Sequence, residues 1–124
     1  MLKNISIIIP AYNEADGIAT FYQSLKKTLP KNYNYELLFV DDGSRDTTRL
    51  ELHKLAKKDS SVKVLSFSKN FGKEAATSAG IHESTGDAII MLDADGQHPV
   101  ELIKDFLKKW ESGAQVVIGI RTDN

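Results

Sequence analysis

The chain contains 124 residues, of which 41% are hydrophobic and 27% are charged, so we expect one globular domain that is long enough to bury a single modest core. Its 16 Lys and Arg residues and 17 Asp and Glu residues leave a net charge of −1, which excludes the basic surface typical of nucleic-acid or membrane-surface binding. The sequence has no cysteine, which excludes disulfides and thiolate metal sites and is compatible with the cytosol.

Short β-branched segments alternate with amphipathic segments along the chain. The first predicted strand, 5–9, is a near-continuous apolar run, as expected for a strand that is covered on both faces. The first predicted helix, 14–29, carries its apolar residues at helical spacing, and Asn13 is its predicted N-cap. Further strands are predicted at 36–40, 62–67, 87–92 and 115–120, and further helices at 46–57, 74–84 and from Pro99 onwards.

This alternation predicts an α/β fold, which is a three-layer, Rossmann-like domain with a mainly parallel sheet. The sequence ends at Asn124 directly after a predicted strand, so we expect residues 1–124 to belong to a domain that is truncated at its C-terminal end. The longest apolar runs, such as 88–92, are of strand length and fall short of the roughly 18 to 20 residues of a membrane-spanning helix. No signal peptide is visible, so we expect a soluble, cytoplasmic chain.

Polar segments follow four of the predicted strands. In a parallel α/β sheet, ligands bind outside the carboxyl ends of the strands, where the strand order reverses. The segments are Pro-Ala-Tyr-Asn-Glu at 10–14, Asp-Asp-Gly-Ser at 41–44, Ser-Lys-Asn-Phe-Gly-Lys at 68–73 and Asp-Ala-Asp-Gly-Gln-His at 93–98. Their gathering at one edge of the sheet predicts a ligand site there.

The segment that begins at Asp93 predicts a metal site. Alternate side chains of an extended segment point the same way, so Asp93 and Asp95 share one direction, and Gln97 joins them if the chain stays extended. Two carboxylates and an amide oxygen suit Mg²⁺ or Mn²⁺. Such an ion would neutralise a diphosphate and the charge that develops on it as a leaving group. The alternative is a solvated acidic turn that caps the following helix.

Two adjacent carboxylates, Asp41 and Asp42, follow the second predicted strand. A plain turn needs only one of them, and neighbouring carboxylates repel each other. We therefore expect one carboxylate, Asp42, to accept hydrogen bonds from a base or a ribose.

Other polar residues at this edge are open to two interpretations. Tyr12 either stacks on a base or packs on the first helix. Lys69 and Lys73 either meet phosphates or are ordinary surface lysines, and Gly72 between them favours a ligand loop. Arg121 either reaches a phosphate or lies on the surface.

These motifs resemble those of family 2 glycosyltransferases of the GT-A fold. The resemblance rests on Ile-Ile-Pro-Ala-Tyr-Asn-Glu at 8–14, Asp-Asp-Gly-Ser at 41–44 and Asp-Ala-Asp-Gly-Gln-His-Pro at 93–99. Ser-Lys-Asn-Phe-Gly-Lys-Glu-Ala-Ala at 68–76 is similar to the branch of dolichol-phosphate mannose synthases and bacterial polyprenyl-phosphate glycosyltransferases. The resemblance covers essentially the whole chain, and the motifs occur in the family's order.

The resemblance implies inverting transfer of a sugar from a UDP- or GDP-sugar donor to an acceptor, which is a lipid-linked phosphate or a glycan. An acceptor phosphate is already anionic near neutral pH, so it needs no strong general base. Asp93 and Asp95 are the candidate catalytic residues, and with Gln97 they would hold Mg²⁺ or Mn²⁺. The candidate nucleotide-sugar-binding residues are Pro10, Tyr12, Asn13, Glu14, Asp41, Asp42, Lys69, Gly72 and Arg121.

Family members continue well past residue 124, with an acceptor-binding region and often membrane-associated helices. The resemblance therefore implies that residues 1–124 are the donor-binding part, which binds nucleotide and metal but transfers sugar poorly. Membrane contact is expected only through the missing C-terminal part, with the parent protein at the cytoplasmic face of the membrane. The sequence leaves open whether the chain forms a homo-oligomer.

Three other protein classes fit part of the pattern. Residues 89–96 resemble the first motif of haloacid-dehalogenase-type phosphatases, with Asp93 as nucleophile, but that motif normally follows the first strand of its domain. A receiver module, which is not an enzyme, carries its acidic pair after the first strand, where this chain has Tyr-Asn-Glu. A nucleotidyltransferase usually carries a glycine-rich loop there, and none is visible.

Overall fold

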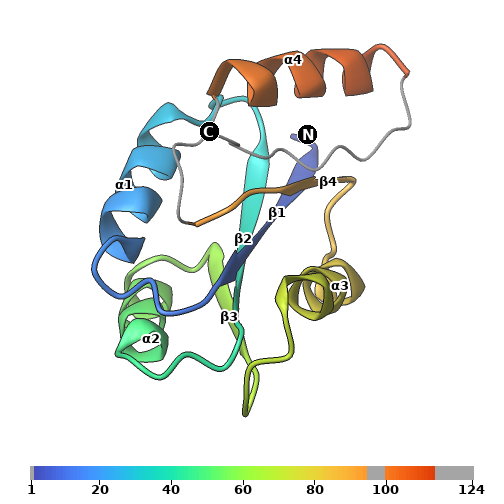
Figure 1. Cartoon of the computed structure of the whole chain (residues 1–124). Helices are drawn as coiled ribbons and strands as arrows, with labels where there is room; N and C mark the ends of the chain where they lie inside the picture. Colours follow the sequence, from blue (N-terminus) through green and yellow to red (C-terminus); the bar gives the residue numbers. More distant parts are fainter. Residues whose placement is uncertain (1, 95–99, 114–124) are drawn as a thin grey trace.

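The computed structural model describes residues 2–94 and 100–113 as strands and helices that alternate along the chain. Four strands form one parallel sheet in the order β3-β2-β1-β4, and helices lie on both of its faces (Figure 1). The predicted three-layer α/β fold is thereby confirmed. The strands are β1 (Asn4–Ala11), β2 (Asn34–Asp41), β3 (Val62–Ser66) and β4 (Ala88–Met91). The helices are α1 (Ile18–Thr28), α2 (Thr48–Lys58), α3 (Lys73–Glu83) and α4 (Val100–Glu111).

The central strand β1 is buried on both faces, which explains its run of isoleucines. Ile7 and Ile9 point into a large core together with apolar residues of α1, α2 and α4. Ile8 points into a smaller core that includes Ala76 of α3. Alternate side chains of a strand leave opposite faces of a sheet, so a two-sided core requires an uninterrupted apolar segment.

Helix α3 lies close to the sheet because its facing residues are small. Ala76 and Gly80 are buried, and a Cβ atom on Gly80 would come within 2.4 Å of the Ile8 Cγ2 atom. These small residues therefore let the helix approach the sheet closely.

The first helix starts later than the sequence predicts, and the predicted cap is wrong. Helix α1 begins at Ile18 after Gly17, and Asn13 lies outside it with a φ of 53°. The Asn13 Oδ1 atom instead accepts a hydrogen bond from the Arg45 backbone N–H at 2.8 Å. Asn13 therefore joins two loops, because its short amide side chain reaches a neighbouring backbone and tolerates a positive φ. The strand predicted at 115–120 lies outside the described residues.

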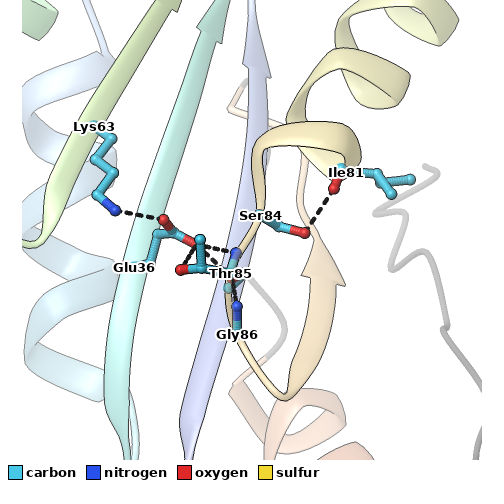
Figure 2. A network of polar contacts seen from close by, with 7 residues as sticks. Glu36, Lys63, Ile81, Ser84, Thr85 and Gly86 are labelled. Carbon is cyan, nitrogen blue, oxygen red and sulfur yellow. Dashed lines mark hydrogen bonds and ion pairs between the residues drawn. The ribbon is translucent and has the colours of Figure 1, made fainter.

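A buried carboxylate joins three strands at the amino-terminal edge of the sheet (Figure 2). Glu36 accepts hydrogen bonds from Ser6 Oγ at 2.6 Å, Lys63 Nζ at 2.7 Å and the Thr85 backbone N–H at 3.0 Å. Burial raises the pKa of Glu36, but these donors outweigh burial and lower the pKa to about 2. Gly86 N–H also donates to Ser6 Oγ, at 2.8 Å, so the network fixes the connection from α3 to β4.

No helix within residues 2–94 and 100–113 is both long enough and apolar enough to span a lipid bilayer.

Candidate functional site

The strand order of the sheet reverses between β1 and β4. Strand β1 pairs with β2 on one side and with β4 on the other. A pocket lies beyond the carboxyl ends of these strands, where parallel α/β sheets bind ligands. Its described lining residues are Pro10, Ala11, Tyr12, Glu14, Asp42, Lys73, Asp93 and Ala94. Sequence motifs that are far apart along the chain therefore meet in one place.

The end of β1 forms one wall of the pocket. Pro10 pairs in register with Val40, and the Asp42 N–H donates to the Ala11 carbonyl at 2.9 Å. The two segments therefore run side by side at the ends of β1 and β2. The Tyr12 side chain follows directly and is 39% exposed, which leaves its ring available at the mouth. Glu14 also lines the pocket, and its backbone N–H donates to Thr48 Oγ1 at 2.8 Å.

Asn13 does not line the pocket among the described residues, although it was a candidate for donor binding. Its N–H donates to Ser44 Oγ at 2.9 Å, and its side chain accepts from Arg45 N–H. Asn13 thus supports the pocket wall from behind by joining the loops that follow β1 and β2. The sequence offers a signal for this role, since Asn favours loops and positive φ angles.

The adjacent carboxylates Asp41 and Asp42 are both buried, with different partners. Asp41 is 1% exposed, and its Oδ1 accepts from the Ser44 N–H at 3.0 Å, which closes the turn after β2. Asp42 is 4% exposed and accepts from the loop that follows β3. Its Oδ1 bonds the Phe71 N–H at 2.8 Å, and its Oδ2 bonds the Gly72 N–H at 3.0 Å. Separate sets of donors explain how two neighbouring carboxylates are tolerated.

Sequence reasoning missed that Asp42 holds this loop. Asn70 Nδ2 also donates to Asp42 Oδ2, at 3.1 Å, so three donors of the loop converge on one carboxylate. The turn at Gly43 also packs tightly against this loop, because a Cβ atom at Gly43 would lie 2.2 Å from the Lys69 carbonyl carbon. No local signal in the sequence could reveal this contact, since it joins residues nearly thirty positions apart in the chain.

The two lysines of this loop have different surroundings. Lys69 is exposed, and its Nζ lies 5.2 Å from the centre of the Phe71 ring. Lys73 is the first residue of α3, lines the pocket and forms an ion pair with Asp93 Oδ1. Gly72 is the N-cap of α3 and has a φ of 103°, a conformation that favours glycine. Its N–H donates the hydrogen bond to Asp42 Oδ2. Lys73 is therefore the pocket lysine, while the structure places Lys69 outside the described lining.

Asp93 stands at the carboxyl end of β4, where the sequence predicts a metal site. The Leu92 N–H donates to the Ile8 carbonyl at 2.9 Å, which continues the pairing with β1 up to Asp93. The Asp93 side chain is 19% exposed and already has a cationic partner in Lys73, so its carboxylate is placed to bind a cation. Within residues 2–94 and 100–113, no cluster of three or more metal-ligating residues occurs. The other predicted ligands Asp95 and Gln97 lie outside the described residues, as does Arg121.

The charges that surround the pocket indicate the kind of ligand it suits. Glu14, Asp42 and Asp93 are acidic, and Lys73 is the single basic residue of the described lining. Such a pocket attracts a polyanion only when a further cation binds with it, because uncompensated negative charges repel. The exposed ring of Tyr12 beside these charges suits a planar group.

Comparison with known proteins identifies the family. The family model described as "Glycosyl transferase family 2" matches residues 6–124, which is nearly the whole chain. The chain belongs to glycosyl transferase family 2. The prediction from the sequence motifs is confirmed, and membership of this family decides against a phosphatase or a receiver module.

Relatives of this family 2 chain include CsbB of Bacillus subtilis (strain 168), which is 48% identical over 118 residues. The match covers 94% of this chain and 36% of CsbB. The prophage bactoprenol glucosyl transferase homolog of Escherichia coli (strain K12) is 42% identical over 120 residues, which cover 96% of this chain and 39% of that protein. The chain therefore spans less than half the length of these relatives.

Solved GT-A glycosyltransferases share the fold of this family 2 chain. The S. aureus protein TarS 1-349, in a crystal structure in complex with UDP-GlcNAc, superposes with a TM-score of 0.70 at 27% identity. The match covers 88% of this chain and 31% of TarS 1-349. The predicted GT-A fold is confirmed, and the match spans less than a third of TarS 1-349.

Proposed function

We propose that this chain is the donor-binding part of a glycosyltransferase that transfers a sugar from a UDP- or GDP-sugar to a polyprenyl phosphate. The observation that carries the proposal is the pocket between β1 and β4, where Tyr12, Asp42 and Asp93 meet in a chain of this family. TarS, which has the same fold, was solved with UDP-GlcNAc, and this supports a nucleotide-sugar donor. Relatives named for bactoprenol glucosyl transfer support a lipid-linked acceptor.

The nucleoside would occupy the part of the pocket next to β1. Tyr12 would stack on the base, and Pro10 and Glu14 would line the same wall. A carboxylate offers about four acceptor positions, and donors among the described residues take three of those of Asp42, which leaves one position on Oδ1. That position would accept one hydrogen bond from the base or the ribose.

The diphosphate would lie between β1 and β4. Asp93, Asp95 and Gln97 would hold Mg²⁺ or Mn²⁺, because carboxylate and amide oxygens are suitable ligands for these hard cations. When bound, the cation would neutralise the diphosphate and the charge of the leaving nucleotide. The chain's own residues would orient the donor so that its anomeric carbon faces away from the buried strand ends.

The reaction would be a single inverting displacement. An acceptor phosphate oxygen would form a bond to the anomeric carbon while the bond from that carbon to the nucleoside diphosphate breaks. The acceptor is anionic near neutral pH and therefore needs no strong general base. Most acceptor contacts would come from residues that correspond to the part of the relatives that this chain does not span. We therefore expect residues 1–124 to bind donor and to transfer sugar poorly. The whole protein would act at the cytoplasmic face of the membrane.

A thermal-shift panel tests the donor site. The chain is heated with UDP, GDP, UDP-glucose or GDP-mannose, each with Mn²⁺, Mg²⁺ or EDTA. A nucleotide at a hundred times its Kd stabilises the folded state by about 2.7 kcal/mol, which raises Tm by roughly 10 °C in a domain of this size. We expect one nucleotide class to raise Tm in the presence of metal, whereas no shift under any metal condition would contradict the proposal.

Asp93→Asn tests the metal's part in that shift. The substitution keeps the size of the side chain and removes its charge, so we expect the metal-dependent part of the shift to disappear. Asp105→Asn is the matched control, since Asp105 is an exposed carboxylate on α4. A metal-dependent shift that survives Asp93→Asn would show that the metal binds elsewhere.

A further inference from the structure

Lys73 is the single cation of the described pocket lining, and it contacts the carboxylate at which the proposed metal would bind. Its Nζ forms an ion pair with Asp93 Oδ1. The Lys73 side chain is 55% exposed, so it can reorient, whereas the Asp93 side chain is 19% exposed and held at the end of β4. The pair therefore joins one movable and one fixed partner.

The start of α3 holds Lys73 within reach of Asp93. The Gly72 N–H donates to Asp42 Oδ2 at 3.0 Å, and the Phe71 N–H donates to Asp42 Oδ1 at 2.8 Å, so the two residues before Lys73 are tied to the end of β2. Close contact between Gly80 and β1 keeps the same helix against the sheet. The backbone of Lys73 is thereby fixed, and only its side chain can move from one contact to another.

A metal ion and Lys73 would compete for Asp93. Two cations that contact one carboxylate repel each other, and this repulsion is stronger near a partly buried site than in bulk water. A metal at Asp93 must therefore displace the ammonium group of Lys73. Once displaced, that group would lie beside a metal-bound diphosphate, which offers it a new anionic partner within the same pocket.

We propose that Lys73 makes metal binding and donor binding depend on each other, by occupying Asp93 until a diphosphate enters with the metal. The inference rests on the proposed donor site and adds the coupling between its two ligands, the metal and the nucleoside diphosphate. Lys73 weakens the binding of a metal alone and strengthens the binding of a nucleoside diphosphate together with the metal. By thermodynamic linkage, the nucleotide raises the affinity for metal by the same factor as the metal raises the affinity for nucleotide.

Two titrations of Lys73→Met test this coupling. The affinity for Mn²⁺ alone is measured from the electron paramagnetic resonance signal of free Mn²⁺. The affinities for UDP and GDP at saturating Mn²⁺ are measured by calorimetry. We expect Mn²⁺ alone to bind about two- to fivefold more tightly, which is the strength of a partly exposed ion pair. We expect the nucleotide to bind about tenfold more weakly, because a charge-assisted contact to phosphate is lost.

Two further variants serve as controls. Lys54→Met removes a lysine that pairs with Glu51 at 3.2 Å on α2, away from the pocket lining, so both affinities should equal those of the unmodified chain. Lys73→Arg keeps the charge and should retain the weak binding of Mn²⁺ alone. The opposite signs of the two effects in Lys73→Met distinguish competition from a structural role, which would weaken both affinities.

The outcomes separate this inference from the proposed function. If the unmodified chain binds UDP or GDP with Mn²⁺ and Lys73→Met behaves as Lys54→Met does, the coupling is wrong and the donor site stands. If Lys73→Met weakens both affinities, Lys73 supports the site and does not compete for Asp93, which also overturns the coupling. If the unmodified chain binds neither nucleotide with Mn²⁺, the donor site fails and the coupling fails with it.

Discussion

Replacing Glu36 with Gln removes the charge from a buried carboxylate and leaves its shape almost unchanged. Glu36 is 9% exposed and accepts hydrogen bonds from Ser6, Lys63 and Thr85 (Figure 2). Burial opposes the charged form of Glu36, but these donors lower its pKa from 4.5 to about 2. A fall of this size corresponds to roughly 3 kcal/mol of folding free energy. The Lys63 side chain is 54% exposed, so solvent screening reduces this to about 2 kcal/mol.

The sign of the pH dependence follows from the direction of the pKa change. Because the pKa of Glu36 is lower in the folded state than in the unfolded state, its stabilisation is complete above the unfolded value of 4.5. The stabilisation is lost as the pH falls towards about 2, where the folded state also takes up the proton. We expect Glu36→Gln to lower the free energy of unfolding by about 2 kcal/mol at pH 7 and by roughly half as much at pH 3.

Urea denaturation followed by circular dichroism measures this difference at both pH values. Other carboxylates titrate in both proteins, so their contributions cancel when the variant is subtracted from the unmodified chain. Lys63→Met is the control that removes one donor and retains the charge of Glu36, and it should cost less than Glu36→Gln at pH 7. An equal loss from Glu36→Gln at pH 7 and pH 3 would refute the reasoning, because the charge of Glu36 would then contribute nothing.

Two further predictions concern packing and ionisation. Gly80→Ala should lower the free energy of unfolding by about 1 to 2 kcal/mol in urea denaturation, since a Cβ atom would come within 2.4 Å of buried Ile8. The control Ser78→Ala, on the exposed face of α3, should leave the free energy of unfolding unchanged. Equal effects of the two substitutions would argue against tight packing of α3. Burial, together with a hydrogen bond to Asp59 at 2.5 Å, raises the pKa of Tyr22 to about 12. A spectroscopic titration should show one tyrosine that ionises near this pH, and Asp59→Asn should lower that value; an unchanged titration would exclude Asp59 as a cause.

The alternation of strands and helices was predictable because each element carries its own periodicity. The apolar run of β1 and the helical spacing of the apolar residues in α1 are local patterns, and the structure confirms both elements. The boundaries were less accurate. Helix α1 begins four residues later than predicted, at Ile18, because Asn13 bonds the loop after β2 and residues 14–17 form a turn. A competing contact from a distant loop leaves no local trace at a helix start.

The amino-acid sequence by itself determined the family, the layered α/β fold and the edge of the sheet at which the polar segments gather. These follow from short motifs and periodic patterns, which local residue choice encodes. Only the tertiary structure decided which partner each charged side chain has. Asp42 holds the loop before α3, Lys73 contacts Asp93, and Glu36 joins three strands. These contacts link residues some twenty to thirty positions apart, so they exist only once the sheet has assembled and the crossovers have set the distances between its strands.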